Sequence, residues 1–125
     1  MHKILVVDDE PRIGKVLHDF LVKSGFEVTQ VLGGEEAIKL LNSEMKIDLM
    51  VLDMKMPKVR GTDVIKEMVR INKEIPTIIL TGSIEAGKYL TDLIKFGYTE
   101  KDILYKPIDL FSLLDMVKKK LKITQ

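Results

Sequence analysis

The chain has 125 residues, of which 46% are hydrophobic and 31% charged, and its formal net charge at pH 7 is +1. This length suits one domain, and so small a net charge creates no strong attraction for nucleic acid or an anionic membrane surface. The absence of cysteine excludes a disulfide scaffold and a thiolate zinc site. No apolar run approaches the roughly 20 residues of a membrane span, and the first residues are not typical of a signal peptide. We therefore expect a cytoplasmic single-domain protein that makes no direct contact with nucleic acid or membrane.

Short apolar segments alternate along the chain with segments of helical periodicity. The predicted strands are residues 4–7, 27–31, 49–52, 77–80 and 102–105. The first, third and fourth are apolar throughout, which is typical of strands that are covered on both faces of a parallel sheet. The second alternates polar and apolar side chains, so we expect it at an edge of the sheet.

The segments between the strands predict helices. The first has an apolar stripe at helical spacing, formed by Ile13, Val16, Leu17, Phe20 and Leu21. Pro11 suits its first turn and Gly25 its C-terminal cap. Further helices are predicted at about residues 34–43, 62–71 and 85–96, and the last follows Asp109, a favourable N-cap. Five successive β–α units predict a three-layer α/β sandwich with right-handed crossovers.

Four of the five predicted strands end in side chains that can bind ions or react: Asp8-Asp9-Glu10, Asp53, Thr81 and Lys106. Open parallel sheets bind ligands outside the carboxyl ends of their strands, where the strand order reverses. With the order 2-1-3-4-5, the four ends would meet in one crevice. Each group alone has a purely structural explanation, such as helix capping by the acids before Pro11 or a turn at Thr81. Their occurrence together favours a site.

The charge of this crevice predicts a bound cation. Asp8, Asp9 and Asp53 are negative and Lys106 is positive, which leaves a charge of −2. Closely packed carboxylates repel one another, and a divalent cation relieves that repulsion. Ligand sets made only of oxygen favour Mg²⁺, Ca²⁺ or Mn²⁺ over zinc, and Mg²⁺ typically leaves a coordination position for phosphate. The crevice therefore suits phosphoryl chemistry.

Four motifs resemble those of the receiver domain of response regulators in bacterial two-component signalling. They are I-L-V-V-D-D-E-P at residues 4–11, L-M-V-L-D-M-K-M-P at 49–57 with Gly61 after it, I-I-L-T-G at 78–82, and L-Y-K-P at 104–107. The resemblance covers essentially the whole chain. It implies one flavodoxin-like domain, similar to the chemotaxis receiver, over residues 1–125, with a five-stranded parallel sheet and no output domain.

The resemblance also implies roles for the acidic residues. Asp53 would be the phosphoacceptor, which takes a phosphoryl group from a phosphohistidine of a sensor histidine kinase or a histidine phosphotransfer protein. Asp8 and Asp9 would hold Mg²⁺ (or Mn²⁺) together with Asp53 and the backbone carbonyl of Lys55. The Lys55 side chain would also tune the lifetime of the phosphoryl group, and we expect it to shield that group from water.

The remaining roles belong to residues at the ends of the last two strands. Thr81 would be the switch hydroxyl, and Lys106 would pair with a phosphoryl oxygen, with a bond to Pro107 that is usually cis in relatives. Ser83 would tune the phosphoryl lifetime. Ile103 stands at a switch position where relatives usually have Tyr or Phe, so the resemblance does not extend to the aromatic half of the usual switch.

The implied output is a change in the surface formed by the fourth helix, the fifth strand and the fifth helix. This surface would bind a downstream protein that the sequence does not identify, and a phosphorylation-dependent dimer is an open alternative. Residues 98–101 extend a loop on this surface, either neutrally or to suit a partner. The protein would catalyse only its own phosphoryl transfer and slow autodephosphorylation.

Two other functions fit the residues less well. An aspartyl-phosphate phosphatase usually has a second aspartate two residues after its nucleophile, where this chain has Lys55. A binding module that no longer takes phosphate would not need the full set of strand-end residues. A phosphoacceptor receiver is therefore the function that we expect.

Overall fold

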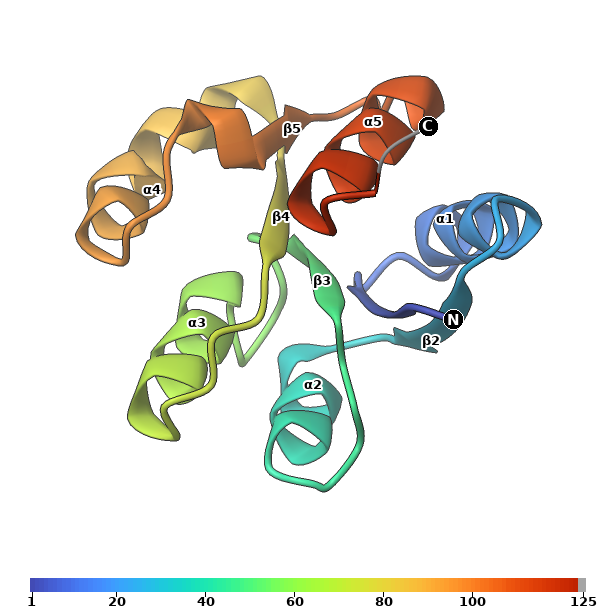
Figure 1. Cartoon of the computed structure of the whole chain (residues 1–125). Coiled ribbons are helices and arrows are strands. Elements are labelled where there is room, and N and C mark those ends of the chain that lie inside the picture. Colours follow the sequence, from blue (N-terminus) through green and yellow to red (C-terminus); the bar gives the residue numbers. More distant parts are fainter. Residues whose placement is uncertain (124–125) are drawn as a thin grey trace.

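Five parallel strands form the sheet at the centre of the molecule (Figure 1). They are β1 (Lys3–Val7), β2 (Glu27–Val31), β3 (Leu49–Asp53), β4 (Thr77–Thr81) and β5 (Ile103–Tyr105), in the order β2-β1-β3-β4-β5. The computed structural model describes residues 1–123, except for the side chains of residues 83–86 and 88. The predicted fold class and strand order are thereby confirmed, and β2 is at an edge of the sheet.

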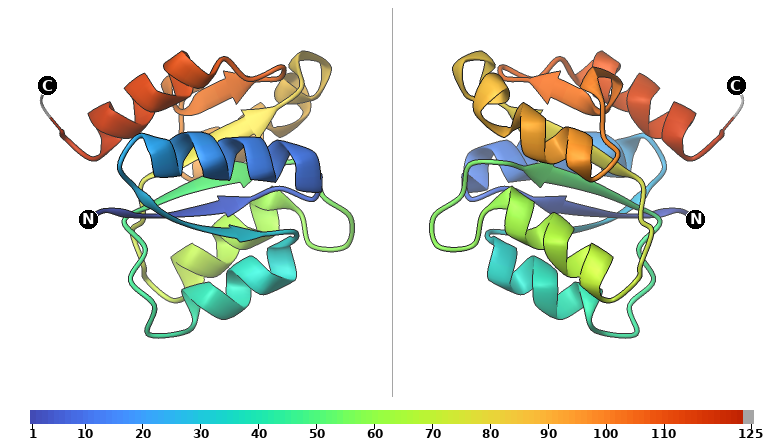
Figure 2. Two further views of the ribbon diagram at one scale, coloured as in Figure 1. Left: turned by 90° about the vertical axis from the view of Figure 1, so that its right-hand side faces the viewer. Right: turned by 90° about the vertical axis from the view of Figure 1, so that its left-hand side faces the viewer.

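Helices cover both faces of the sheet. They are α1 (Pro11–Lys23), α2 (Gly34–Leu41), α3 (Gly61–Arg70), α4 (Ser83–Lys95) and α5 (Leu110–Lys120), with a short 3₁₀ turn, η1 (Glu100–Asp102), before β5. Figure 2 shows α1 and α5 on one face and α2, α3 and α4 on the other. None of the described helices is both long and apolar enough to cross a membrane.

Alternate side chains of the central strands supply two separate hydrophobic cores. Leu5, Met50 and Ile79 belong to the core beneath α2, α3 and α4, whereas Ile4 and Val51 belong to the core beneath α1 and α5. Every residue of β3 and β4 is buried, which explains why these strands lack the alternation of a half-exposed strand. The rigid sheet thus sets the positions of the residues at its carboxyl edge.

Local signals determine where the helices begin and end. Pro11 starts α1, and Gly25 follows that helix with φ +98°, a left-handed conformation that glycine adopts without strain. The carboxylate of Asp109 accepts hydrogen bonds from the backbone N–H groups of two residues in the first turn of α5. Helix α4 begins at Ser83, directly after Gly82, which is about two residues earlier than the periodicity predicts.

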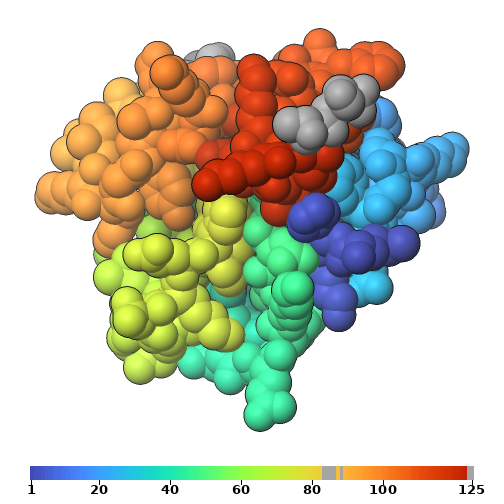
Figure 3. All heavy atoms as spheres, in the orientation of Figure 1, coloured from blue at the N-terminus to red at the C-terminus, as the bar shows by residue number. Residues whose placement is uncertain are grey.

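The lengthened loop before β5, residues 98–101, is held by local hydrogen bonds and adjoins Asp102, which forms an ion pair. The Thr99 hydroxyl accepts a hydrogen bond from the Lys101 N–H, and the Asp102 carboxylate accepts one from the Thr99 N–H. Asp102 also forms an ion pair with Lys120 of α5. In Figure 3, the red surface of α5 lies between the orange region that precedes it and the blue N-terminal residues. The segment is thus an ordered part of the surface around α5.

Candidate functional site

Lys106 links the carboxylates that follow β1 and end β3. Its Nζ lies 3.4 Å from Asp53 Oδ2 and 3.6 Å from Asp8 Oδ2. It also lies 3.7 Å from Oε1 of Glu10, an exposed residue at the start of α1. The backbone positions this lysine, because the Lys106 N–H donates a hydrogen bond of 2.9 Å to the carbonyl oxygen of Thr81 at the end of β4. The predicted meeting of the strand ends is therefore present in the structure.

The two buried carboxylates differ in their hydrogen bonding, and only Asp8 has an oxygen that lacks a partner among the described residues. Asp8 is fully buried, and its Oδ1 accepts a hydrogen bond of 2.9 Å from the Glu10 N–H. Among the described residues, its Oδ2 has no hydrogen-bond partner, and Lys106 is its nearest cation. Asp53 Oδ1 accepts a hydrogen bond of 3.4 Å from the Lys55 N–H. Because a buried carboxylate oxygen without a hydrogen bond is costly, Asp8 Oδ2 is well suited to a metal ion or its bound water.

Burial makes these carboxyl groups hard to ionise. It raises the pKa of Asp53 to about 7, and the nearby charge of Asp8 adds to the rise while Lys106 opposes it. Burial likewise raises the pKa of Asp8 above its ordinary 3.8. For Lys106, burial alone would lower the pKa, but the carboxylates of Asp53, Asp8 and Glu10 outweigh burial and raise it. Lys106 thus stays charged, whereas near neutral pH the Asp53 carboxyl group is protonated in part of the molecules.

A cluster of acidic residues adjoins this pair of buried aspartates. Carboxylate oxygens of Asp8, Asp9 and Glu10 all lie within 4.8 Å of one another. Asp9 is half-buried and Glu10 is exposed, so the cluster opens towards solvent on one side. Asp8 and Asp9 are predicted metal ligands, whereas Glu10 was not predicted, although it belongs to the same acidic run of the sequence. Oxygen donors of this kind suit Mg²⁺ or Mn²⁺.

The predicted switch residues lie close to the end of β4. Thr81 is buried, and its hydroxyl donates a hydrogen bond of 3.3 Å to the Gly82 carbonyl oxygen. Ile103 is 5% exposed and belongs to the same buried cluster as Tyr89 and Leu93 of α4. Ser83 is the first residue of α4, and its side chain lies outside the described residues.

A cavity of about 740 Å³ surrounds the acceptor side of the site. It is lined by Asp9, Glu10, Asp53, Lys55, Met56, Pro57, Arg60, Gly82, Tyr89 and Lys106. Arg60 and Tyr89 were not predicted as site residues, because neither lies at the end of a strand. The bond between Lys106 and Pro107 is cis, as the resemblance implies.

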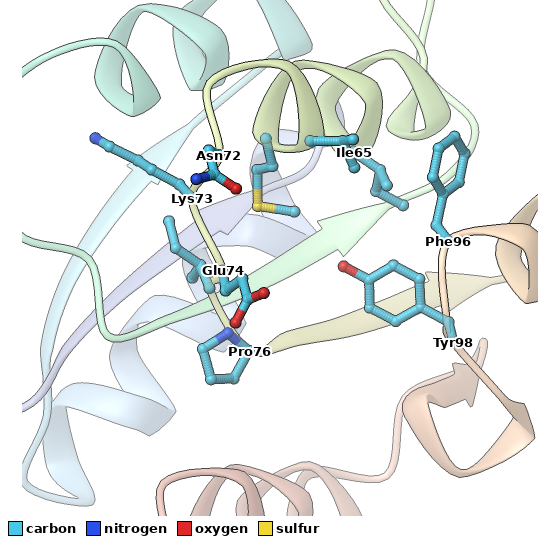
Figure 4. A pocket seen from close by; sticks show the side chains of 10 residues that line it. Ile65, Asn72, Lys73, Glu74, Pro76, Phe96 and Tyr98 are labelled. Atoms are coloured by element: carbon cyan, nitrogen blue, oxygen red, sulfur yellow. The ribbon is translucent and has the colours of Figure 1, made fainter.

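A second cavity, of about 510 Å³, lies at the opposite end of the sheet, before β4 begins (Figure 4). Its walls include Ile65 and Met68 of α3, together with Phe96 and Tyr98, which follow α4. Figure 4 shows the Tyr98 ring beneath α3, with its hydroxyl directed into the cavity. None of the predicted site residues lines this cavity.

Comparisons with known proteins agree with this geometry. The family model of the response regulator receiver domain matches residues 4–118. Response regulator SaeR of Staphylococcus aureus (strain USA300) is 44% identical over 81 residues, which is 65% of this chain and 35% of that protein. The chain therefore spans about a third of the length of the curated relatives that it matches.

Solved structures show the same arrangement of the whole chain. The receiver domain of the Francisella response regulator 1452 has a TM-score of 0.85 at 28% identity, and both chains are covered completely. Response regulator TrrA of Thermotoga maritima, solved in complex with Mg²⁺-BeF, has a TM-score of 0.78 at 32% identity, with 96% of this chain and 99% of that one covered. Together with the family match over residues 4–118, these likenesses show that the chain belongs to the response regulator receiver domain family of two-component signalling.

Proposed function

We propose that Asp53 accepts a phosphoryl group from a phosphohistidine, on a sensor histidine kinase or a histidine phosphotransfer protein, in a reaction that requires Mg²⁺ or Mn²⁺. The observation that supports this most directly is the contact of Lys106 with both buried carboxylates, beside an Asp8 oxygen that lacks a hydrogen bond among the described residues. One cation between two acids leaves a negative site that is suited to a metal ion and then to a phosphoryl group.

The metal would be held by oxygen atoms of the acidic cluster. Asp8 and Asp9 of this cluster would supply carboxylates together with Asp53, and the backbone carbonyl of Lys55 is the fourth proposed ligand. Glu10 adds a further carboxylate to the cluster. When bound, Mg²⁺ neutralises negative charge on the transferring group and on Asp53. TrrA, which shares 32% identity with this chain, was solved with Mg²⁺-BeF, which supports this choice of metal.

The phosphoryl transfer places distinct demands on three side chains. An ionised Asp53 oxygen attacks phosphorus, the phosphorus–nitrogen bond to imidazole breaks, and its electron pair stays on the departing nitrogen. Lys106, 3.4 Å from Asp53 Oδ2, then pairs with an oxygen of the new acyl phosphate. The Thr81 hydroxyl exchanges the weak bond to Gly82, 3.3 Å long, for a bond to another phosphoryl oxygen.

The proposed output is a changed protein-binding surface on α4, β5 and α5. Only Gly82 separates Thr81 from the first residue of α4, and the register partner of Thr81 on β5 is Tyr105. A shift of the Thr81 hydroxyl therefore acts on both elements, and the Asp102–Lys120 ion pair extends the connection to α5. We propose that the only reactions the protein catalyses are its own phosphorylation and slow autodephosphorylation, and that the surface binds a downstream protein or a second copy.

A mass measurement with a small phosphodonor tests the proposal. Acetyl phosphate and Mg²⁺ should add one acid-labile phosphoryl group to the protein, and EDTA should prevent the addition. Asp53→Asn should abolish it, whereas Asp115→Asn, which removes an exposed carboxylate on α5, should leave it unchanged. No mass gain with Mg²⁺ present, or an equal gain in Asp53→Asn, would refute the proposed acceptor.

A further inference from the structure

Tyr89, in the second turn of α4, faces the phosphoacceptor cavity. Its side chain is 8% exposed, and it lines the same cavity as Asp53, Lys106 and Gly82. Among the described residues that line this cavity, it is the one aromatic side chain. A phenol that lines a cavity with the proposed phosphoacceptor is a candidate hydrogen-bond donor to an anion that forms there.

Ile103 and Tyr105 of β5 are less able to sense that anion. Ile103 has no polar side-chain atom and is packed in the buried cluster that also contains Tyr89. Tyr105 is the register partner of Thr81, but it is 41% exposed and does not line the cavity. An anion on Asp53 can therefore act on Ile103 only through packing, whereas Tyr89 lines the cavity and carries a hydroxyl donor.

No hydrogen bond joins the Tyr89 hydroxyl to another described residue, and its oxygen is not one of the buried atoms that lack a partner. A phosphoryl group would bring three acceptor oxygens and a charge of about −1.5 to −2 into the cavity that this residue lines. Phosphorylation would thus offer the hydroxyl a charged acceptor, to which a hydrogen bond is stronger than to a neutral one.

We propose that the Tyr89 hydroxyl donates a hydrogen bond to a phosphoryl oxygen on Asp53, and that this bond transmits phosphorylation to α4. The inference rests on the proposed function of Asp53. Tyr89 of α4 would then supply the aromatic part of the switch, which Ile103 of β5 cannot supply because it has no ring. Because Gly82 alone separates Thr81 from α4, Tyr89 and Thr81 would act on this helix together, one from its second turn and one from its start.

The test measures the binding of beryllofluoride with Mg²⁺ by NMR, using backbone amides of residues 53–55 for the site and of residues 89–95 for the helix. Tyr89→Phe keeps the ring and its packing but removes the hydroxyl. We expect it to bind beryllofluoride roughly threefold to tenfold more weakly and to lose more than half of the α4 response. Tyr98→Phe, which alters a tyrosine that lines the second cavity, should behave as the wild type.

Each outcome of this titration bears on one of the two proposals. If the amides of residues 53–55 respond in the wild type, the proposed function stands. An unchanged affinity or an unchanged α4 response in Tyr89→Phe then overturns the role of Tyr89 alone. If those amides do not respond even in the wild type, the acceptor site and the role of Tyr89 are both refuted.

Discussion

Removing the charge of Asp53 should stabilise the protein at alkaline pH. Its pKa in the folded protein is about 7, against an ordinary 3.8, because the carboxyl is buried and lies near Asp8. Between these two pH values the folded state holds a proton that the unfolded state has released. The free energy of unfolding therefore falls as pH rises through this window, which is the opposite of the usual effect of a salt-bridged aspartate.

The size of this effect follows from the difference in pKa. Each pH unit between about 4 and 7 corresponds to about 1.4 kcal/mol, so the full window is worth at most roughly 4 kcal/mol. In Asp53→Asn this penalty disappears, and Lys106 still has Asp8 at 3.6 Å and Glu10 at 3.7 Å as partners. We expect the free energy of unfolding of the variant to exceed that of the wild type by roughly 2–4 kcal/mol at pH 8 without metal. At pH 4.5 the difference should be less than about 1 kcal/mol.

Urea unfolding at a series of pH values between 4.5 and 8.5 measures this difference. Comparing the two proteins at each pH cancels the titration of their common carboxylates, and Asp115→Asn controls for the loss of one surface charge. Addition of Mg²⁺ at pH 8 should stabilise the wild type much more than Asp53→Asn, since the metal binds the folded state. A stability difference that does not change between pH 5 and pH 8, or that favours the wild type at pH 8, would refute the reasoning.

Two further predictions concern the surroundings of the acceptor. Lys55→Ala should shorten the autodephosphorylation half-life of phosphorylated protein, because the exposed side chain lines the cavity, where it would shield an acyl phosphate from water. An unchanged half-life would contradict this role. Gly61→Ala should destabilise the protein by about 1–3 kcal/mol in urea unfolding, because an added Cβ would lie 2.7 Å from the Asp53 carbonyl oxygen and 2.9 Å from Met54 Cα. Its matched control is Gly87→Ala in α4, where the added Cβ meets nothing within 4 Å, so we expect stabilisation by about 0.5–1 kcal/mol.

The fold was predictable because its main determinants are local. Uninterrupted apolar runs predicted the central strands, and helical periodicity with Pro11, Gly25 and Asp109 predicted the helices that follow. The strand order then follows from the small number of ways in which such units pack. Helix ends were predicted less accurately: α4 begins two residues early, and α2 ends at Leu41 instead of near residue 43.

The candidate site was predictable to the extent that its residues belong to strand ends. Asp8, Asp53, Thr81 and Lys106 directly end or directly follow a strand, so the parallel sheet itself brings them together. Glu10 was missed as a neighbour of Lys106 because its side-chain direction depends on how α1 starts. That detail belongs to side-chain packing, which no spacing in the sequence encodes.

The sequence by itself thus determined the order of strands and helices and the polar groups at the carboxyl edge of the sheet, because periodicity and chain direction are properties of neighbouring residues. Only the tertiary structure decided that Lys106 reaches three carboxylates, that one Asp8 oxygen lacks a hydrogen bond among the described residues, and that burial raises the pKa of Asp53 to about 7. It also placed Tyr89 in the acceptor cavity through the packing of α4. These features depend on distances between residues far apart in the chain and on the exclusion of water, which arise only when the helices pack on the sheet.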